Sequence, residues 1–262
     1  AGGGAPPRPG GRPATTPTAS SRPSSPTRKG SGTVYKRCLT PFMTLPITFI
    51  TDYGVADDFA GVCRAVIAKI APDVRVIDIT HGVARHDVRE ASAVLAETVP
   101  YSPQAVHLVV VDPGVGGHRR ALAVRPVESG HLFVAPDNGL LPPALDALGG
   151  VAEAVDISKS RFRLERASAT FHGRDLFAPV AANLALGASL ADAGEEIDPG
   201  SLERPPVSRP ELEQHRAFAH AIRIDGFGNI SLDLSSDQLS GHPLAGAPRV
   251  SVGSRTPRRT AP

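Results

Sequence analysis

Hydrophobic positions along the chain repeat at two different spacings, and the spacing changes from segment to segment. Short apolar, β-branched runs indicate strands, and apolar residues at every third or fourth position indicate helices. Residues 106–111 are almost continuously apolar, which predicts a central strand buried on both faces. We expect strands at 47–51, 74–79, 106–111, 121–124 and 132–135, and helices at 57–70, 87–99 and 175–186.

Strands that alternate with helices predict an α/β fold, with a central, mostly parallel or mixed sheet flanked by helices. Further along, weak alternation at 217–224 and 230–234 around a Gly-rich turn predicts a hairpin. We therefore expect an α/β domain at 47–203, a Pro-rich linker at 204–214, and a smaller, incomplete all-β domain at 215–252.

The two ends of the chain have a different composition from the rest. Residues 1–46 are nearly all Gly, Pro, Ser, Thr and Arg, so they cannot bury enough apolar surface to offset the entropy of ordering. We expect this segment and residues 253–262 to be disordered. The composition of the first segment also fits a transit peptide. Met43 is the one Met and directly precedes the first strand, so we interpret residues 1–42 as sequence upstream of the natural start.

Charge is divided unevenly along the sequence. Residues 1–46 hold seven basic and no acidic residues, whereas the whole chain has a net charge of +2, so the remainder is net negative. That balance argues against a nucleic-acid groove in the folded part. No apolar run approaches the roughly 18 residues that a membrane span needs. Cys38 and Cys63 form neither a disulfide framework nor a metal-type spacing, so we expect a cytoplasmic protein. From the charge balance and the absence of a long apolar run, we expect neither nucleic-acid nor membrane partners.

Charged residues stand beside glycines in three segments, at 110–120, 170–177 and 225–229. Glycine permits tight turns and a close approach of backbone to a ligand, and ligands of α/β proteins bind at the carboxyl ends of strands. Asp112 follows three valines, and a carboxylate at the mouth of a buried strand needs a partner. A Gly-rich turn could fold Arg119 back onto it.

The residues by themselves leave structural interpretations open. Asp112 and Arg119 could be an ion pair that only fixes a turn, and His172 could be a structural histidine. Asp175 is interpreted as a helix cap, and Arg174 as a surface residue or an ion-pair partner.

An acidic cluster offers another kind of site. Asp52, Asp57 and Asp58 lie near Asp78 and His81 in the sequence, and such groups suit a hydrolytic metal. However, the sequence has no two-His helical motif, and Asp57 is explained as a cap for the helix that follows. A metal-dependent hydrolase remains an alternative, and we expect no metal.

Six short motifs occur in one order along residues 47–240. They are Thr-Asp-Tyr-Gly at 51–54, Asp-Ile-Thr-His at 78–81, Val-Asp-Pro-Gly-Val-Gly at 111–116 with Arg119 and Arg120, Pro-Asp-Asn-Gly at 136–139, Thr-Phe-His-Gly-Arg-Asp at 170–175, and Asp225 with Phe-Gly-Asn at 227–229. This series resembles the S-adenosylmethionine (SAM) hydroxide adenosyltransferase family, which is related to the SAM-dependent fluorinase and chlorinase.

The resemblance implies an N-terminal α/β domain and a smaller, β-barrel-like C-terminal domain. It also implies a homotrimer, in which each active site lies between the N-terminal domain of one subunit and the C-terminal domain of the next. The catalytic set of the hydrolytic branch falls here on Asp112, Arg119 and His172. Substrate-binding roles fall on Asp52 at the ribose hydroxyls, and on Asp225, Phe227 and Asn229 at the methionine end.

The chemistry explains why such residues would be needed. The sulfonium of SAM is a good leaving group, and attack at the ribose C5′ requires an activated water in line with the carbon–sulfur bond. Asp112 and His172 would orient this water and take its proton, while Arg119 would stabilise the developing hydroxide. No metal or organic cofactor is required.

The resemblance therefore implies hydrolysis of SAM to adenosine and methionine. The halogenating relatives lack the charged set, since a carboxylate repels a bare halide, and a halogenase-like enzyme remains an alternative. Only 33 residues follow Asn229, and the Asn-Ser-type segment that holds adenine in the family is not visible. We expect a C-terminus truncated near Arg249, so an inactive SAM- or adenosine-binding protein is a further alternative.

Overall fold

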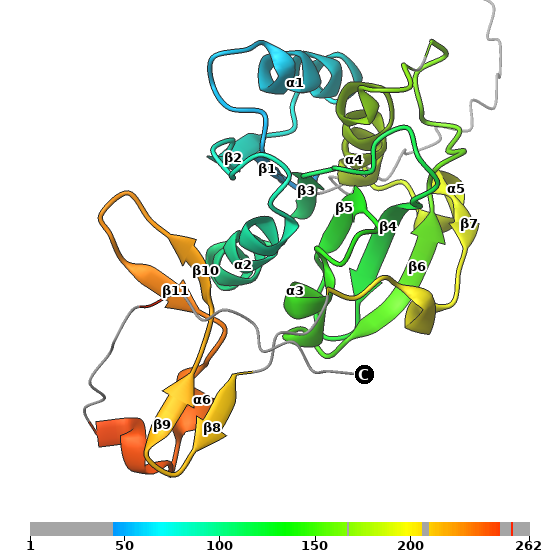
Figure 1. Ribbon diagram of the computed structural model, residues 1–262. Coiled ribbons are helices and arrows are strands. Elements are labelled where there is room, and N and C mark those ends of the chain that lie inside the picture. The colour runs from blue at the N-terminus through cyan, green and yellow to red at the C-terminus, as the bar shows by residue number, and fades with distance from the viewer. Residues whose placement is uncertain (1–43, 167, 206–209, 247–252, 254–262) are drawn as a thin grey trace, which may run out of the picture. The chain divides into compact units, whose positions relative to one another are not determined.

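The computed structural model describes residues 44–166, 168–205, 210–246 and Gly253. Seven strands form one mixed sheet in the order β2-β1-β3-β5-β4-β6-β7 (Figure 1). Strands β2, β1, β3 and β5 run parallel, and β4, β6 and β7 each pair antiparallel with their neighbours. The bounds are β1 Ile47–Thr51, β2 Val76–Thr80, β3 Val106–Val110, β4 Ala121–Pro126, β5 Leu132–Pro136, β6 Val151–Asp156 and β7 Glu195–Glu196.

Helices cover both faces of this sheet (Figure 1). Helices α1 (Phe59–Ile70), α4 (Ala178–Ala185) and α5 (Leu190–Ala193) pack on one face, and α2 (Val88–Thr98) and α3 (Pro142–Asp146) pack on the other. Because side chains alternate along a strand, Leu108 joins the first core and Val109 joins the second. The predicted α/β fold is confirmed, and all five residues of β3 are buried as predicted.

The start and the cap of the helix predicted at 57–70 are wrong. Helix α1 begins at Phe59, and Asp58 stands at its N-cap without a side-chain hydrogen bond, so Asp57 is not its cap. The side chain of Phe59 is 39% exposed, because it packs beside the rings of Tyr53 and Phe171 instead of joining the core stripe. Helix α2 follows the prediction closely, and Asp87 caps it by accepting a hydrogen bond from the Glu90 N–H.

The helix predicted at 175–186 begins as a single π-helical turn, η2 (Gly173–Phe177), and continues as α4. Asp175 is therefore not a cap. Its buried carboxylate pairs with Arg174 and accepts a hydrogen bond from the Ser168 N–H at 2.7 Å. The ion-pair interpretation of Arg174 is confirmed. The sequence did not predict β6, β7, α3 or α5, which are short or weakly patterned.

The C-terminal part, from residue 210 onward, contains two short hairpins. Strands β10 (Ala221–Ile224) and β11 (Ile230–Leu232) form the predicted hairpin. A second hairpin, β8 (Glu211–Glu213) with β9 (Arg216–Phe218), begins inside the stretch expected to be linker. A short helix, α6 (Ser236–Leu239), means that this part is not all-β. The disorder predicted for residues 1–46 is wrong at residues 44–46, because the Leu45 N–H donates to the Ala185 carbonyl oxygen at 3.0 Å and the Pro46 carbonyl oxygen accepts from the Val106 N–H at 2.9 Å. The predictions for residues 1–43, for residues 254–262 and for a truncation at Arg249 lie outside the described residues.

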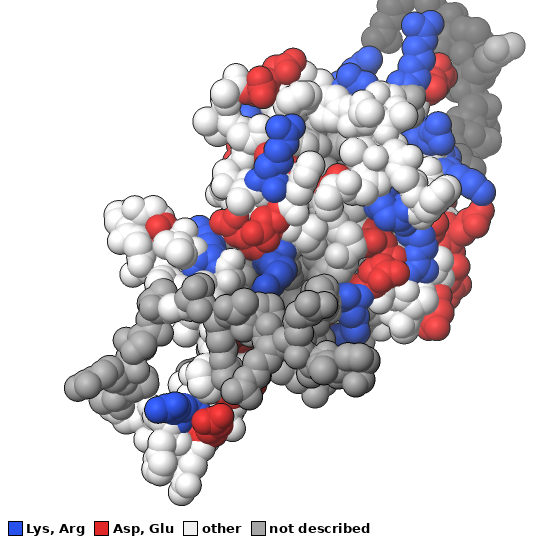
Figure 2. All heavy atoms as spheres, viewed as in Figure 1, with Lys and Arg blue, Asp and Glu red and all other residues white. Residues whose placement is uncertain are grey.

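On the face drawn in Figure 2, acidic and basic side chains lie interspersed over the sheet-bearing part of the molecule. Among the residues that the structure describes, none of the helices has the length and apolar character to span a bilayer.

Candidate active site

Asp112 and Arg119 form a bidentate ion pair beside the carboxyl end of β3. The Arg119 Nε donates to Asp112 Oδ1 at 2.8 Å, and Nη2 donates to Oδ2. The Arg119 side chain is only 12% exposed, and the Asp112 side chain only 6%. A paired guanidinium and carboxylate with two parallel hydrogen bonds is held in a defined orientation. The predicted return of Arg119 onto Asp112 is confirmed.

Two glycines allow the turn that joins this pair. A Cβ on Gly114 would lie 3.1 Å from the Arg119 Cγ, so a larger residue would push the arginine away. Gly116 has a φ of +77°, and a Cβ there would lie 2.7 Å from the Ala169 carbonyl oxygen. Only glycine adopts this left-handed conformation at such close range without strain. The same contact brings the 168–172 segment next to the turn.

His172 completes the cluster from a distant part of the sequence. The Arg119 Nη2 lies 3.0 Å from its Nδ1. Arginine can only donate hydrogen bonds, so Nδ1 is the acceptor and the neutral ring carries its proton on Nε2. Burial, and then the charge of Arg119, lower the pKa of His172 below its ordinary value. The imidazole is consequently neutral at pH 7.

Arg119 is the centre of this arrangement. Its guanidinium carbon lies 5.2 Å from the centroid of the Phe177 ring, and its Nη1 donates to the Arg120 carbonyl oxygen at 3.4 Å. The Asp112–Arg119 pair is thus more than a clamp on its own turn, because the same guanidinium contacts His172.

The π-helical turn sets where His172 stands. The Ala178 N–H bonds to the Gly173 carbonyl oxygen, five residues back instead of four. Such turns hold one more residue than an α-helical turn and are frequent at functional sites. His172 immediately precedes this turn and Phe177 closes it, so both contacts of Arg119 depend on the local winding.

Asp52 follows β1 and is held by the backbone of His86. Its Oδ2 accepts a hydrogen bond from the His86 N–H at 2.8 Å. His86 has a φ of 64°, and it is the one non-glycine residue with positive φ among those described. His86 could not be predicted from the sequence, because it contributes a backbone N–H in an unusual conformation. Side-chain patterns do not indicate such a contact.

Tyr53 lies beside the same cluster. Burial raises the pKa of its phenol, and the charges of Asp52 and Asp112 act in the same direction, so the hydroxyl stays neutral. Its ring packs against Phe171, next to His172, at a centroid distance of 5.9 Å. Tyr53 belongs to the motif at 51–54, but the sequence pattern alone indicates no role for it.

The turn at 225–229 is held by hydrogen bonds among its own residues. Asp225 Oδ1 accepts from the N–H groups of Phe227 and Asn229 at 2.9 and 2.8 Å, and Asn229 Nδ2 donates to Asp225 Oδ2 at 2.7 Å. Phe227 is 96% exposed. Among the described residues, no hydrogen bond or ion pair joins this turn to the cluster around Arg119. The structure therefore unites Asp112, Arg119 and His172 and leaves Asp225, Phe227 and Asn229 as a separate group.

A family model described as the SAM hydroxide adenosyltransferase N-terminal domain matches residues 47–194. The chain belongs to the SAM hydroxide adenosyltransferase family. A relative from Salinispora arenicola named (R)-S-adenosyl-L-methionine hydrolase is 51% identical over 212 residues, which are 80% of each chain. A fluorinase from Nocardia brasiliensis is 26% identical over 217 residues, covering 74% of this chain and 72% of the fluorinase.

Solved structures also resemble this member of the SAM hydroxide adenosyltransferase family. The crystal structure of an uncharacterized conserved protein from Thermotoga maritima superposes with a TM-score of 0.68 at 38% identity, covering 74% of each chain. The likeness in sequence and in fold confirms the predicted family.

Asp78 and His81, which belong to the acidic cluster noted in the sequence, form ion pairs and hydrogen bonds with neighbouring side chains. Asp78 pairs with Arg64 at 2.8 Å and with His81 at 3.0 Å, and His81 also bonds Thr51. Within the described ranges, no three His, Cys, Asp or Glu side chains gather closely enough to hold a metal ion. Asp57 and Asp58 are exposed instead at the rim of an open hollow of about 310 Å³ beside His81.

Proposed function

We propose that this protein hydrolyses S-adenosylmethionine to adenosine and methionine. The contact of one guanidinium with both Asp112 and His172 carries the proposal, because it joins a carboxylate, a cation and a neutral imidazole in one place. The 51% identical relative named (R)-S-adenosyl-L-methionine hydrolase supports it. We extend the proposal to the R configuration at the sulfonium for the same reason.

In the proposed reaction, the oxygen of a water molecule attacks the ribose C5′ as the C5′–sulfur bond breaks. The electrons of that bond return to sulfur, so methionine leaves as a neutral thioether. The water loses one proton and becomes the 5′-hydroxyl of adenosine. Holding water and substrate in line lowers the barrier, because much of the entropic cost of their encounter is met on binding.

The hydrogen bonds assign the parts of this step. His172 Nδ1 is occupied by Arg119, so the ring is free to donate from Nε2 and orient the water. Each oxygen of Asp112 accepts one bond from Arg119 and keeps a further lone pair, so Asp112 is the proposed proton acceptor. The charge of Arg119 stabilises the developing hydroxide. From the sequence, Asp112 and His172 are both expected to take the proton of the water. In this assignment Asp112 alone takes it, and His172 orients the water.

Substrate binding is also a proposal. The Oδ2 of Asp52 is held by His86, and the carboxylate would accept hydrogen bonds from both ribose hydroxyls. Asp225, Phe227 and Asn229 would contact the methionine end from the neighbouring subunit of a homotrimer. The 96% exposure of Phe227 supports a role toward another molecule. Independence from metals and organic cofactors, a cytoplasmic location and the absence of nucleic-acid and membrane partners stay predictions.

A halogenase-like activity is not favoured by the site. The carboxylate of Asp112 would face the incoming halide, and like charges at close range in a poorly solvated site repel strongly. The lower identity of the fluorinase agrees with this reasoning.

The reaction is tested by incubating the purified protein with the separate R and S epimers of SAM in ¹⁸O-labelled water. Chromatography with mass spectrometry should show adenosine and methionine from the R epimer, with one ¹⁸O in the adenosine and none in the methionine. Chloride or fluoride should leave adenosine as the only nucleoside product. Unlabelled adenosine, or a halogenated nucleoside, would contradict the proposed attack of water at C5′.

The shared site is tested by mixing two inactive variants. Asp112→Asn removes the proposed base from one domain, and Asp225→Ala removes the proposed methionine contact from the other. Mixed trimers contain some sites with both native residues, so the mixture should regain activity that neither variant has alone. A mixture that exchanges subunits but stays inactive would mean that each chain builds its own site.

A further inference from the structure

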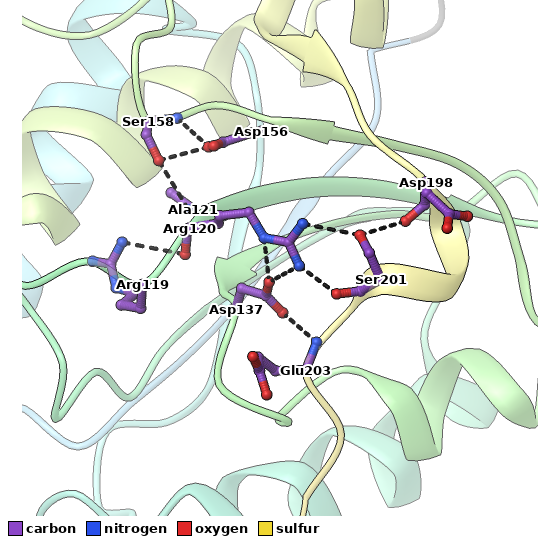
Figure 3. Close-up of polar contacts among 9 residues, drawn as sticks. All are labelled: Arg119, Arg120, Ala121, Asp137, Asp156, Ser158, Asp198, Ser201 and Glu203. Atoms are coloured by element: carbon purple, nitrogen blue, oxygen red, sulfur yellow. Dashed lines mark hydrogen bonds and ion pairs between the residues drawn. The ribbon is translucent and has the colours of Figure 1, made fainter.

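Arg120, next to the proposed catalytic Arg119, has its own carboxylate partner. Its Nε donates to Asp137 Oδ2 at 2.7 Å, and its Nη1 donates to the Ser201 Oγ at 2.9 Å (Figure 3). The Asp137 side chain is only 3% exposed. Asp137 follows the end of β5, so this pair joins the beginning of β4 to the end of its neighbouring strand.

The backbone connects this pair to Arg119. The Arg120 carbonyl oxygen accepts a hydrogen bond from the Asp137 N–H at 2.9 Å and another from the Arg119 Nη1 at 3.4 Å. One carbonyl oxygen is thus held between Asp137 and the catalytic guanidinium. The Nε and Nη2 atoms of Arg119 remain directed to Asp112 and His172.

Residues 198–203, which include η3 (Pro199–Ser201), hold the pair from the other side. Asp137 Oδ1 accepts from the Glu203 N–H at 2.9 Å, and the Ser201 Oγ donates to the Asp198 carbonyl oxygen at 2.7 Å (Figure 3). Asp137 therefore uses both oxygens and its backbone N–H, and it has little freedom to turn.

We infer that Arg120 and Asp137 are positioning residues for Arg119, acting through the Arg120 carbonyl oxygen. The inference rests on the proposed function. Two neighbouring guanidinium groups compete for nearby carboxylates, and a like charge without its own partner would repel Arg119. Because Asp137 neutralises Arg120, Arg119 keeps both oxygens of Asp112 and its contact with His172.

The test compares three variants with the wild type. In Arg120→Ala the buried Asp137 carboxylate loses its partner and competes for Arg119, whereas in Asp137→Asn the Arg120 charge loses its partner and repels Arg119. Each variant should lower kcat by about tenfold to a hundredfold, because small displacements of a catalytic group are costly, with little change in KM. Arg120→Lys keeps the charge and one hydrogen bond, so it should recover part of the loss. Arg204→Ala is the matched control, since Arg204 pairs with the exposed Asp146 from the same 201–205 segment and should leave kcat unchanged.

A double-mutant cycle separates positioning from general stability. Arg119→Lys should abolish most activity, and adding Arg120→Ala should then cost little more, because the second change acts through the first residue. The inference would be overturned if the loss in kcat of the double variant equalled the product of the two single losses. An Arg120→Ala enzyme with native kcat would overturn it as well.

A measurement without substrate keeps the inference apart from the proposed reaction. The charge of Arg119 helps to lower the pKa of His172, so Arg120→Ala should raise that pKa toward the ordinary histidine value in an NMR titration. The His172→Gln spectrum assigns the signal, and Arg204→Ala should leave the pKa as in the wild type. If the wild type releases no adenosine but this shift occurs, the proposed function fails while the positioning holds. An unshifted pKa in Arg120→Ala would refute the positioning.

Discussion

The two ends of the same parallel strands carry histidines in opposite surroundings. Beyond the carboxyl end of β3, His172 touches an arginine that is paired with a carboxylate. Near the amino ends of β1, β3 and β5, His107 bonds Thr48 at 2.7 Å and His131 at 2.9 Å. One end of the sheet gathers charged groups around its histidine, and the other end surrounds its histidine with neutral ones.

The difference shows in how the two rings are held. His107 is completely buried and stacks on Phe133 at a centroid distance of 4.8 Å. Burial, and then the neighbouring His131, lower the pKa of His107 to about 3. For His172, burial also acts first, but the next cause is the charge of Arg119. A lowered pKa therefore does not mark a reactive histidine by itself, and the partners of the ring distinguish a site from a core.

The largest expected effect lies at the charged end. Asp112→Asn keeps the shape of the side chain but removes the proposed base, so the rate of adenosine release should fall by about a hundredfold to ten-thousandfold. Asp146→Asn breaks an exposed Arg–carboxylate pair and should leave the rate unchanged. Circular dichroism should show both variants folded. A folded Asp112→Asn enzyme with native activity would remove Asp112 from the mechanism.

The neutral end should govern stability instead of rate. Below pH 6.5 an unfolded chain protonates His107, whereas the folded protein resists until about pH 3. The contribution of His107 to the free energy of unfolding should therefore have its full value above pH 6.5. It should fall by several kcal/mol between pH 6.5 and about pH 3, at about 1.4 kcal/mol per pH unit.

His107→Gln should reduce this pH dependence in urea titrations and leave adenosine release at pH 7.5 unchanged. His215→Gln, at an exposed position, should keep the wild-type dependence. If His107→Gln retained the whole pH dependence, the loss of stability in acid would have to come from other groups.

A smaller effect should follow from replacing His172 by Gln. The amide oxygen can still accept from Arg119 and the amide nitrogen can still donate, so His172→Gln should lose about tenfold in kcat where His172→Ala loses more. Because the pKa of His172 is lowered, the wild type should lose activity through His172 protonation only below pH 6.5. The pH–rate profile of His172→Gln should lack that step, and an unchanged profile would exclude His172 as its source.

The smallest effect on stability should come from Phe227→Ala. At 96% exposure, its removal should change the free energy of unfolding by less than about 0.5 kcal/mol. The KM for SAM should nevertheless rise, since Phe227 is proposed to pack on the methionine end. An unchanged KM would separate this residue from the substrate.

Some of this arrangement could be predicted from local sequence, and some could not. A carboxylate after three valines indicated Asp112 at the mouth of a buried strand, and the glycines indicated the turn back to Arg119. The approach of His172, 53 residues after Arg119, came only from the family resemblance, because no local pattern reports so distant a contact. The His86 N–H is a backbone group, and its direction is set by the conformation of the loop and not by any side chain.

The errors in the predicted elements have similar causes. The helix predicted from residue 57 begins only at Phe59, whose ring packs against Tyr53 and Phe171. Asp175 has the residue type of a cap, yet burial beside Arg174 places it inside a π-helical turn. In each case contacts between separate segments outweighed a local preference.

The position of His172 in the proposed mechanism depends on the number of residues in the π-helical turn before α4. Deleting any one residue between 173 and 177 would let the backbone close into ordinary α-helical winding, which advances about 100° per residue. Helix α4 would keep its place against the sheet, while the imidazole at its leading end would rotate away from the guanidinium. A family member shortened by one residue at this turn would retain the fold and lose its alignment, so a gap there is a mark by which inactive homologues could be recognised.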